Sequence, residues 1–319
     1  MRQKFILFVL LFSAVAAFSA ASEHGTLVRG ATLYVAPGST AEKLMQVERG
    51  RDMVVLEHTN MDNVTWVKVF VTIVSQGVQG QNRRDVTGWV ISKGLVTSST
   101  PNGDQIIYGE AVDSENQAEQ RGGRKGAAQD AMRLYYRMWE FFPNSPLAGE
   151  ALWRAADIRW QLEKADILPR PSSREMDPDL RDPIDDTMMK EVEKKFPHSK
   201  WSDLAAYDLI DNKLCGDWKG ISKCPDRESD VYEHYAHEHP QSPKAPEALY
   251  NAAWRQAALV DIYRISNQND KSAAARKKAV ALAQEVVNQY PQQADWKPRA
   301  LDLIYKLEQN VQVYGNQTD

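Results

Sequence analysis

A ten-residue segment that occurs twice is the feature that most constrains the fold of this chain. Residues 143–152 read PNSPLAGEAL and residues 240–249 read PQSPKAPEAL, so seven of the ten positions are identical. Each copy follows an amphipathic stretch that ends in Phe142 or His239. Recurrence at this scale is typical of helical repeat proteins, whose units stack on their neighbours to bury their apolar faces.

The chemistry of the repeated segment predicts a tight turn between two helices. Its first proline would end the preceding helix, and the serine two residues later would cap the following helix. A second proline would then occupy the first helical position, where a missing N–H costs nothing. Two weaker copies occur as well, and the last of them lacks the serine. The predicted turn residues are Pro143, Ser145, Pro197, Ser199, Pro240, Ser242 and Pro291.

The N-terminus has the pattern of a signal peptide over residues 1–21. Arg2 and Lys4 precede an apolar stretch over 5–17, and small residues follow at 17–21. The apolar stretch is short for a membrane span, and no cysteine nearby could carry a lipid anchor. We expect cleavage and release to the periplasm or the exterior, with an uncleaved anchor as the alternative. No later stretch of the sequence could span a membrane.

Residues 25–97 predict a small all-β barrel, because short β-rich segments alternate with Gly, Pro and Asn turns. The polar, glycine-containing residues 75–87 are expected to form a long hairpin loop. Residues 98–126 contain STPNG and RGGRKG and are expected to be a linker with at most a frayed helix. A helical repeat domain is expected over 127–315. The strands are predicted near 32–35, 43–47, 52–58, 65–74 and 88–91.

Residues 26–97 resemble the bacterial SH3 domain family. The resemblance rests on LYVAPG at 33–38, ERG at 48–50, WVKV at 66–69 and GWV at 88–90. It implies an SH3-like barrel that binds cell-wall peptides or other short peptides. Tyr34 and Trp66 are the candidate ligand-binding residues, with a place in the barrel core as the alternative reading, which we favour for Trp89.

Residues 127–313 resemble the tetratricopeptide-like repeats of outer-membrane assembly lipoproteins (the BamD type) and of the Tol-Pal-associated periplasmic coordinator. These families share an aromatic-Pro-x-Ser turn between paired helices, which stands here at 142–145, 196–199 and, with His in place of the aromatic residue, 239–242. The resemblance implies a helical array that presents a concave surface to a protein partner.

Cys215 and Cys224 are the only cysteines, and they flank a short loop between two predicted helices. In an exported protein such a pair favours a disulfide. Two separate thiols and a disulfide between chains are the alternatives.

Motifs for catalysis are not found: the sequence has no Walker A, HExxH, GxSxG or CxxC pattern. The histidines at 234, 237 and 239 could suggest a metal site, but histidine near a helix C-terminus is also favoured by the helix dipole. No distant Cys or His completes a ligand set, so we expect no metal and no cofactor. The formal net charge of −4 argues against general nucleic-acid binding.

The sequence therefore predicts a multi-domain chain, with a small SH3-like barrel followed by an all-α tetratricopeptide-like array. We expect a non-enzymatic scaffold or adaptor of a bacterial envelope, which binds protein partners and peptidoglycan or peptide ligands. Two alternatives remain: an enzyme or enzyme accessory in cell-wall remodelling, and a structural subunit of an envelope assembly.

Overall fold

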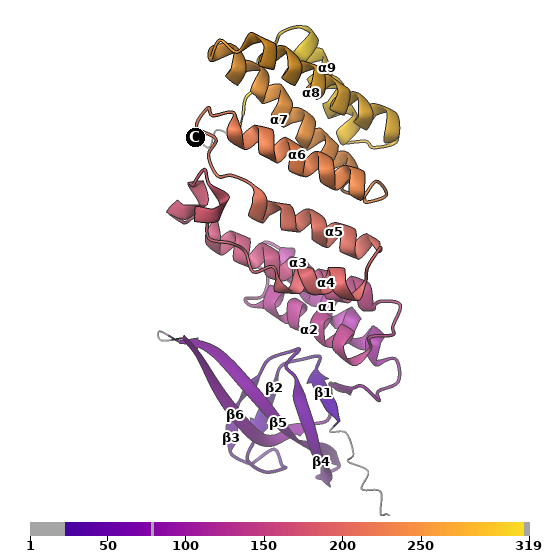
Figure 1. The fold of residues 1–319 in the computed structure, drawn as a ribbon. Helices are drawn as coiled ribbons and strands as arrows, with labels where there is room; N and C mark the ends of the chain where they lie inside the picture. The colour runs from indigo at the N-terminus through magenta and orange to yellow at the C-terminus, as the bar shows by residue number, and fades with distance from the viewer. Residues whose placement is uncertain (1–22, 78–79, 316–319) are drawn as a thin grey trace, which may run out of the picture.

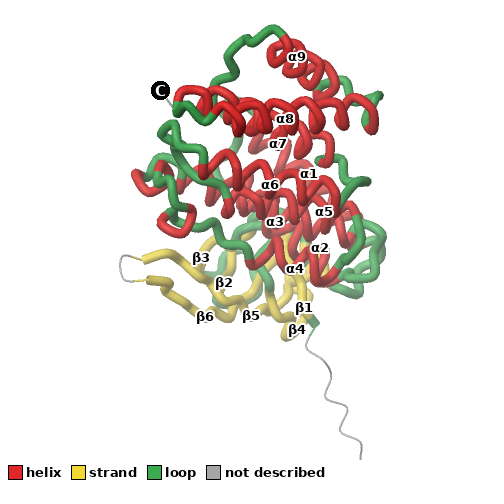
Figure 2. The backbone as a smooth tube through the Cα atoms, turned by 45° about the horizontal axis from the view of Figure 1, so that its top comes forward, coloured by secondary structure: helices red, strands yellow, loops and turns green. Residues whose placement is uncertain are grey.

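The computed structural model describes residues 23–77 and 80–315. An antiparallel β domain is followed by a stack of helices, as the sequence predicts at this level (Figure 1). Figure 2 shows the strands gathered at one end of the molecule and the helices layered beyond them. The predicted signal peptide over 1–21 lies outside the described residues.

The β domain is a seven-stranded sheet that curls into a half-barrel, in the order β3-β2-β6-β5-β4-β1-β7. Alternate residues of its strands enclose an apolar core that includes Leu27, Leu33, Val47, Val69 and Val90. Each of these side chains is at most 1% exposed. The strands are β1 (His24–Leu27), β2 (Ala31–Tyr34), β3 (Lys43–Val47), β4 (Met53–Met61), β5 (Val64–Gly77), β6 (Gly80–Ile91) and β7 (Leu95–Thr97).

The prediction of a loop over 75–87 is wrong, because most of these residues continue the β5–β6 ladder. The register runs from Trp66 opposite Ile91 to Gly77 opposite Gly80. Strand β4 pairs with β5 only as far as Val71, so the outer half of this hairpin projects beyond the sheet (Figure 1). The sequence over 75–85, SQGVQGQNRRD, is almost entirely polar or glycine, so it lacks the apolar alternation that usually signals a strand.

The expected linker between the two domains is mostly helical, which corrects the predicted domain boundaries. Helix α1 occupies most of the expected linker over 98–126, and its Ile107 and Ala111 are fully buried against α2. Its buried stripe is narrow and consists largely of small residues, so it gives a weak amphipathic signal. The helices are α1 (Gly103–Glu119), α2 (Ala127–Phe141), α3 (Ala148–Ile167), α4 (Thr187–Lys195), α5 (Lys200–Asp208), α6 (Lys223–Glu238), α7 (Ala245–Ile265), α8 (Asn269–Gln289) and α9 (Trp296–Glu308), with short 3₁₀ helices at η1 (Pro171–Arg174), η2 (Pro178–Leu180) and η3 (Leu209–Lys213).

The repeated turns do join paired helices, but their serines act in two different ways. Ser199 caps α5 and forms a reciprocal capping box with Ser202. Ser145 and Ser242 instead accept hydrogen bonds from the backbone N–H two residues later, at 3.3 and 3.1 Å. Helices α3 and α7 begin only at Ala148 and Ala245, so the second proline of each motif lies in the turn rather than at the first helical position.

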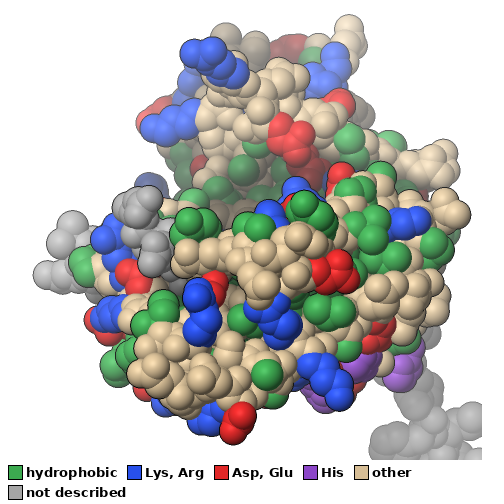
Figure 3. Space-filling model, turned by 90° about the horizontal axis from the view of Figure 1, so that it is seen from above, with side chains coloured by type: hydrophobic (Ala, Val, Ile, Leu, Met, Phe, Trp, Pro, Cys, Tyr) green, Lys and Arg blue, Asp and Glu red, His purple; other side chains and the backbone are tan. Residues whose placement is uncertain are grey.

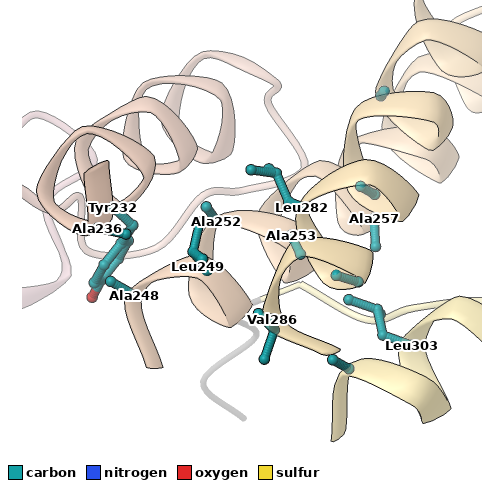
Figure 4. Packing of buried hydrophobic residues seen from close by; sticks show 14 of the residues in the cluster. Tyr232, Ala236, Ala248, Leu249, Ala252, Ala253, Ala257, Leu282, Val286 and Leu303 are labelled. Atoms are coloured by element: carbon teal, nitrogen blue, oxygen red, sulfur yellow. The ribbon is translucent and has the colours of Figure 1, made fainter. Parts of the chain in front are cut away.

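Small residues set the close spacing of the last helices. Ala248, Ala252 and Ala253 of α7 are fully buried between α6 on one side and α8 on the other (Figure 4). Larger side chains such as Leu282 of α8 and Leu303 of α9 fill the remaining space. The apolar interior of the helical domain therefore consists of successive clusters along the stack, of which this one is the last.

The two domains are packed directly against each other. Gly50, in the turn between β3 and β4, has a φ of +71°, and a Cβ there would lie 2.6 Å from the Cβ of Arg133 on α2. Arg133 Nε donates to the carbonyl of Arg49 at 2.9 Å, and the Arg49 guanidinium pairs with Glu110 of α1. Val96 of β7 belongs to the apolar cluster of α1 and α2. The domains therefore share a core as well as polar contacts.

The predicted disulfide between Cys215 and Cys224 is confirmed, with a Cα–Cα distance of 6.0 Å. The loop that the disulfide closes is also held by hydrogen bonds to the carboxylate of Glu228, which is 1% exposed. This carboxylate accepts from Cys215 N at 2.9 Å, from Trp218 Nε1 at 3.1 Å and from Arg255 Nε at 2.7 Å. The loop is thus fixed by a covalent bond and by a buried ion pair.

Gly50→Ala should weaken the docking of the β domain on the helices. An alanine at this positive φ is strained, and its Cβ would overlap Arg133, so we expect a loss of about 1–3 kcal/mol in the free energy of unfolding. Gly109→Ala is the matched control, because Gly109 is exposed on α1 and a Cβ there meets nothing within 4 Å. Urea unfolding measures both; equal stabilities for the two variants would contradict the docking described above.

Replacing both Cys215 and Cys224 with alanine should destabilise the helical domain by about 2–3 kcal/mol, since the short loop loses its constraint on the unfolded chain. Urea unfolding of the double variant and of the wild type measures the change. The wild type, denatured without reductant, should show no reactive thiols. Labelling of two thiols per chain would refute the disulfide.

Candidate functional site

The two aromatic residues predicted to bind ligand have different environments. Trp66 is 2% exposed, so its side chain is covered in this structure, on the sheet face opposite Val67 and Val69 of the barrel core. Tyr34 is half-buried and meets the ring of Trp66 edge-on at 5.4 Å between centroids. Trp89 is buried, as expected. Tyr34 remains a candidate on the β domain, supported from beneath by Trp66.

A more distinctive arrangement lies on the helical domain, where polar side chains of α1, α3, α5 with η3, and α7 meet. We call this cluster the acidic face. It has six carboxylates and only three basic groups. Its members are Glu115, Glu150, Arg154, Asp157, Lys164, Asp208, Asp211, Lys244 and Glu247.

At the edges of the acidic face, the basic side chains are paired with carboxylates. Arg154 bonds Glu115 at 2.8 Å and Glu150 at 3.0 Å, and the Tyr135 hydroxyl donates to Glu115 at 2.6 Å. Lys244 bonds Glu247 at 2.8 Å. Arg154 and Lys244 are therefore already paired and do not neutralise the other carboxylates of the acidic face.

At the centre of the acidic face, fewer basic groups balance the negative charge of the carboxylates. The carboxylate of Asp211 accepts a hydrogen bond from Lys164 Nζ at 2.6 Å, and that of Asp157 accepts one from Gln161 Nε2 at 3.1 Å. Within the described residues, the carboxylate of Asp208 makes no hydrogen bond and no ion pair. The pKa of Asp208 is raised to about 7, first by burial and then by the nearby charges of Asp157 and Asp211, against the opposing effect of Lys244 and Lys164.

The pKa of Asp157 is raised as well, mainly by burial. Asp157 on α3 thus disfavours the charged form of Asp208 on the neighbouring helix α5, and Glu115 acts in the same way on Asp157. A cation placed between them would relieve both. Chemically, the arrangement is suited to holding an ammonium or guanidinium group.

The three histidines singled out in the sequence do not come together. His234 pairs with Glu238 at 3.1 Å, His237 with Glu285 of α8 at 3.2 Å, and His239 with Asp203 of α5 at 2.9 Å. No group of His, Cys, Asp or Glu side chains able to hold a metal ion occurs in the described part of the chain. His237 and His239 instead link neighbouring helices.

Sequence reasoning missed the acidic face because its members are spread from residue 115 to residue 247. One signal was present: Glu150 and Glu247 occupy the same position in the two copies of the repeated segment.

A scan against protein-family models and a search of curated proteins both find no match to this chain. Within 23–77 and 80–315, no helix is long and apolar enough to cross a membrane.

Asp208→Asn should stabilise the protein at pH 8 and change little near pH 5. The folded protein holds the Asp208 proton more tightly than the unfolded chain, whose aspartates titrate near 3.9, so wild-type stability falls as pH rises from about 4 to about 7. We expect a gain of about 1 kcal/mol at pH 8, since the carboxylate still reaches solvent.

Urea unfolding at the two pH values measures this difference. Asp166→Asn, which alters an exposed carboxylate on the same helix as Asp157, is the control and should behave like the wild type. A gain for Asp208→Asn that is equal at pH 5 and pH 8 would show that the charge of Asp208 is not the cause.

Proposed function

We propose that this protein is a non-enzymatic scaffold whose helical domain binds a protein partner, and that the acidic face receives a basic segment of that partner. The observation that carries the proposal is the pair Asp157 and Asp208, two half-buried carboxylates of which the first raises the pKa of the second and the second has no hydrogen bond among the described residues. Such a pair lowers the stability of the free protein, and groups held at a cost of this kind cluster at functional sites.

The helical hairpins support this proposal because each turn repeats the same sequence pattern. Stacked hairpins resembling tetratricopeptide repeats offer an extended surface to which consecutive units contribute equivalent positions. The acidic face is built in this way, from α3, α5 and α7, each of which follows one copy of the turn. We infer that an extended basic segment lies across these helices.

The charge distribution favours a protein partner over nucleic acid. Basic and acidic side chains are interspersed on the face shown in Figure 3, without an area of one sign, and the formal net charge is −4. Nucleic-acid binding depends on concentrated positive charge.

The cellular setting and the role of the β domain are part of the same proposal. The signal-peptide pattern and the disulfide support an exported protein of the bacterial envelope. The short antiparallel strands and the GWV segment support an SH3-like barrel, on which Tyr34 would contact a cell-wall or other peptide.

A labelled basic peptide tests the acidic face. A fluorescein-labelled nonapeptide of alternating lysine and alanine should bind the full chain at pH 8, as followed by fluorescence anisotropy. Asp157→Asn combined with Asp208→Asn should weaken binding about tenfold, because two charge-assisted contacts are lost. Wild-type affinity should also fall as the pH is lowered from 8 to 5 and Asp208 takes up a proton.

Asp166→Asn serves again as the control and should bind like the wild type. Equal affinity of the wild type and the double variant would show that the peptide does not use the acidic face. An affinity that is unchanged between pH 8 and pH 5 would count against the central role of Asp208.

A further inference from the structure

A second candidate binding surface lies at the junction of the two domains, on elements that do not contribute to the acidic face. It is a cavity of about 510 Å³, between the strands β4, β5 and β6 on one side and α2 on the other. This volume is within the range of ligand sites, about 300–1,000 Å³. We call it the junction groove.

The floor of the junction groove is apolar. Val54 of β4 and Phe70 of β5 are direct cross-strand partners, and both side chains lie on the sheet face opposite the barrel core, in which Val69 and Val71 are buried. Val74, farther along β5, is 39% exposed and lines the same cavity. Met132 of α2 covers the floor from the helix side.

The rim of the junction groove is basic. Four arginines line it, Arg51, Arg83, Arg133 and Arg137, against the single carboxylate of Asp52. That carboxylate accepts a hydrogen bond from His24 at 3.0 Å and also acts on the charge of Arg137, so one carboxylate faces four arginines.

Two of the rim arginines have charge that is only partly compensated. Arg83 projects from the β5–β6 hairpin, is 71% exposed and reaches Asp85 only at 3.7 Å. Arg137 is mostly buried on α2 and pairs with Glu140, yet its Nε is buried and has no hydrogen-bond partner among the described residues. Arg51 and Arg133, in contrast, are held by Glu48 and Asp130 respectively.

We propose that the junction groove binds an extended acidic peptide segment. Guanidinium groups form paired hydrogen bonds with carboxylates, and the apolar floor would receive the aliphatic parts of the same segment. The apolar floor favours a peptide with aliphatic side chains over a nucleic acid or the polar headgroups of a phospholipid surface. This proposal does not depend on the acidic face, which would take a ligand of opposite charge.

Binding of a defined acidic peptide to the full chain tests the proposal. The probe is a fluorescein-labelled hexapeptide of alternating glutamate and leucine, and the comparison peptide has glutamine in place of glutamate. We expect the glutamine peptide to bind at least about tenfold more weakly, because it lacks the charge for the arginines. Arg83→Gln should weaken binding of the glutamate peptide about tenfold, and Arg137→Gln should do so as well.

Arg264→Gln is the matched control. Arg264 is 64% exposed on α7, far along the chain from the junction groove, and pairs with a neighbouring carboxylate as Arg83 does. Because Arg83 is exposed, its substitution leaves the fold intact and makes the test valid even if Arg137→Gln is unstable.

Three results would overturn the proposal. The first is equal binding of the glutamate and glutamine peptides, and the second is unchanged affinity in Arg83→Gln. The third is binding of anionic phospholipid vesicles or single-stranded DNA by a protein that does not bind the glutamate peptide, which would assign the groove to another class of ligand.

Discussion

The packing of Gly50 against α2 determines how the rest of the molecule is arranged. At this point the backbone of the β3–β4 turn lies directly on the helix, with no side chain between them, so there is no room for the domains to slide. The Arg49–Glu110 pair and the shared apolar cluster around Val96 act in the same direction. As a result, the β5–β6 hairpin is held beside α2, and the junction groove has two fixed walls.

The candidate surfaces have opposite charge and lie on different parts of the chain. The acidic face is formed by side chains of α1, α3, α5 with η3, and α7, whereas the junction groove exists only because the β domain is docked on α2. As proposed, two such surfaces would hold two partners, or two segments of one partner, in a defined geometry. The buried Glu228–Arg255 pair and the disulfide hold the loop between η3 and α6, in the middle of the helical array.

The sequence predicted the features that depend on local chemistry. The repeated proline and serine residues indicated paired helices, and the spacing of Cys215 and Cys224 indicated the disulfide. Prediction from the sequence failed where the hydrophobic pattern was weak or where the structure depends on residues far apart in the chain. Helix α1 buries a narrow stripe of mostly small residues, and the outer β5–β6 ladder is almost entirely polar in sequence, so neither has a strong hydrophobic pattern.

The candidate sites could not be read from the sequence for a related reason. Trp66 was predicted as a possible ligand contact, but its side chain is only 2% exposed. Asp208 gains its raised pKa from Asp157, on another helix, and from burial, which no spacing along the chain reveals. Arg83 and Arg137 are more than fifty residues apart and meet only across the domain junction.

The rigid docking of the two domains is tested most directly by a distance distribution between spin labels on each domain. Glu57→Cys on β4 and Asn116→Cys on α1 place labels at exposed sites on opposite sides of the junction, and the native disulfide leaves no other thiol to react. Pulsed electron paramagnetic resonance should give one narrow distance distribution. A broad distribution, as expected for two domains on a flexible connection, would contradict the rigid docking.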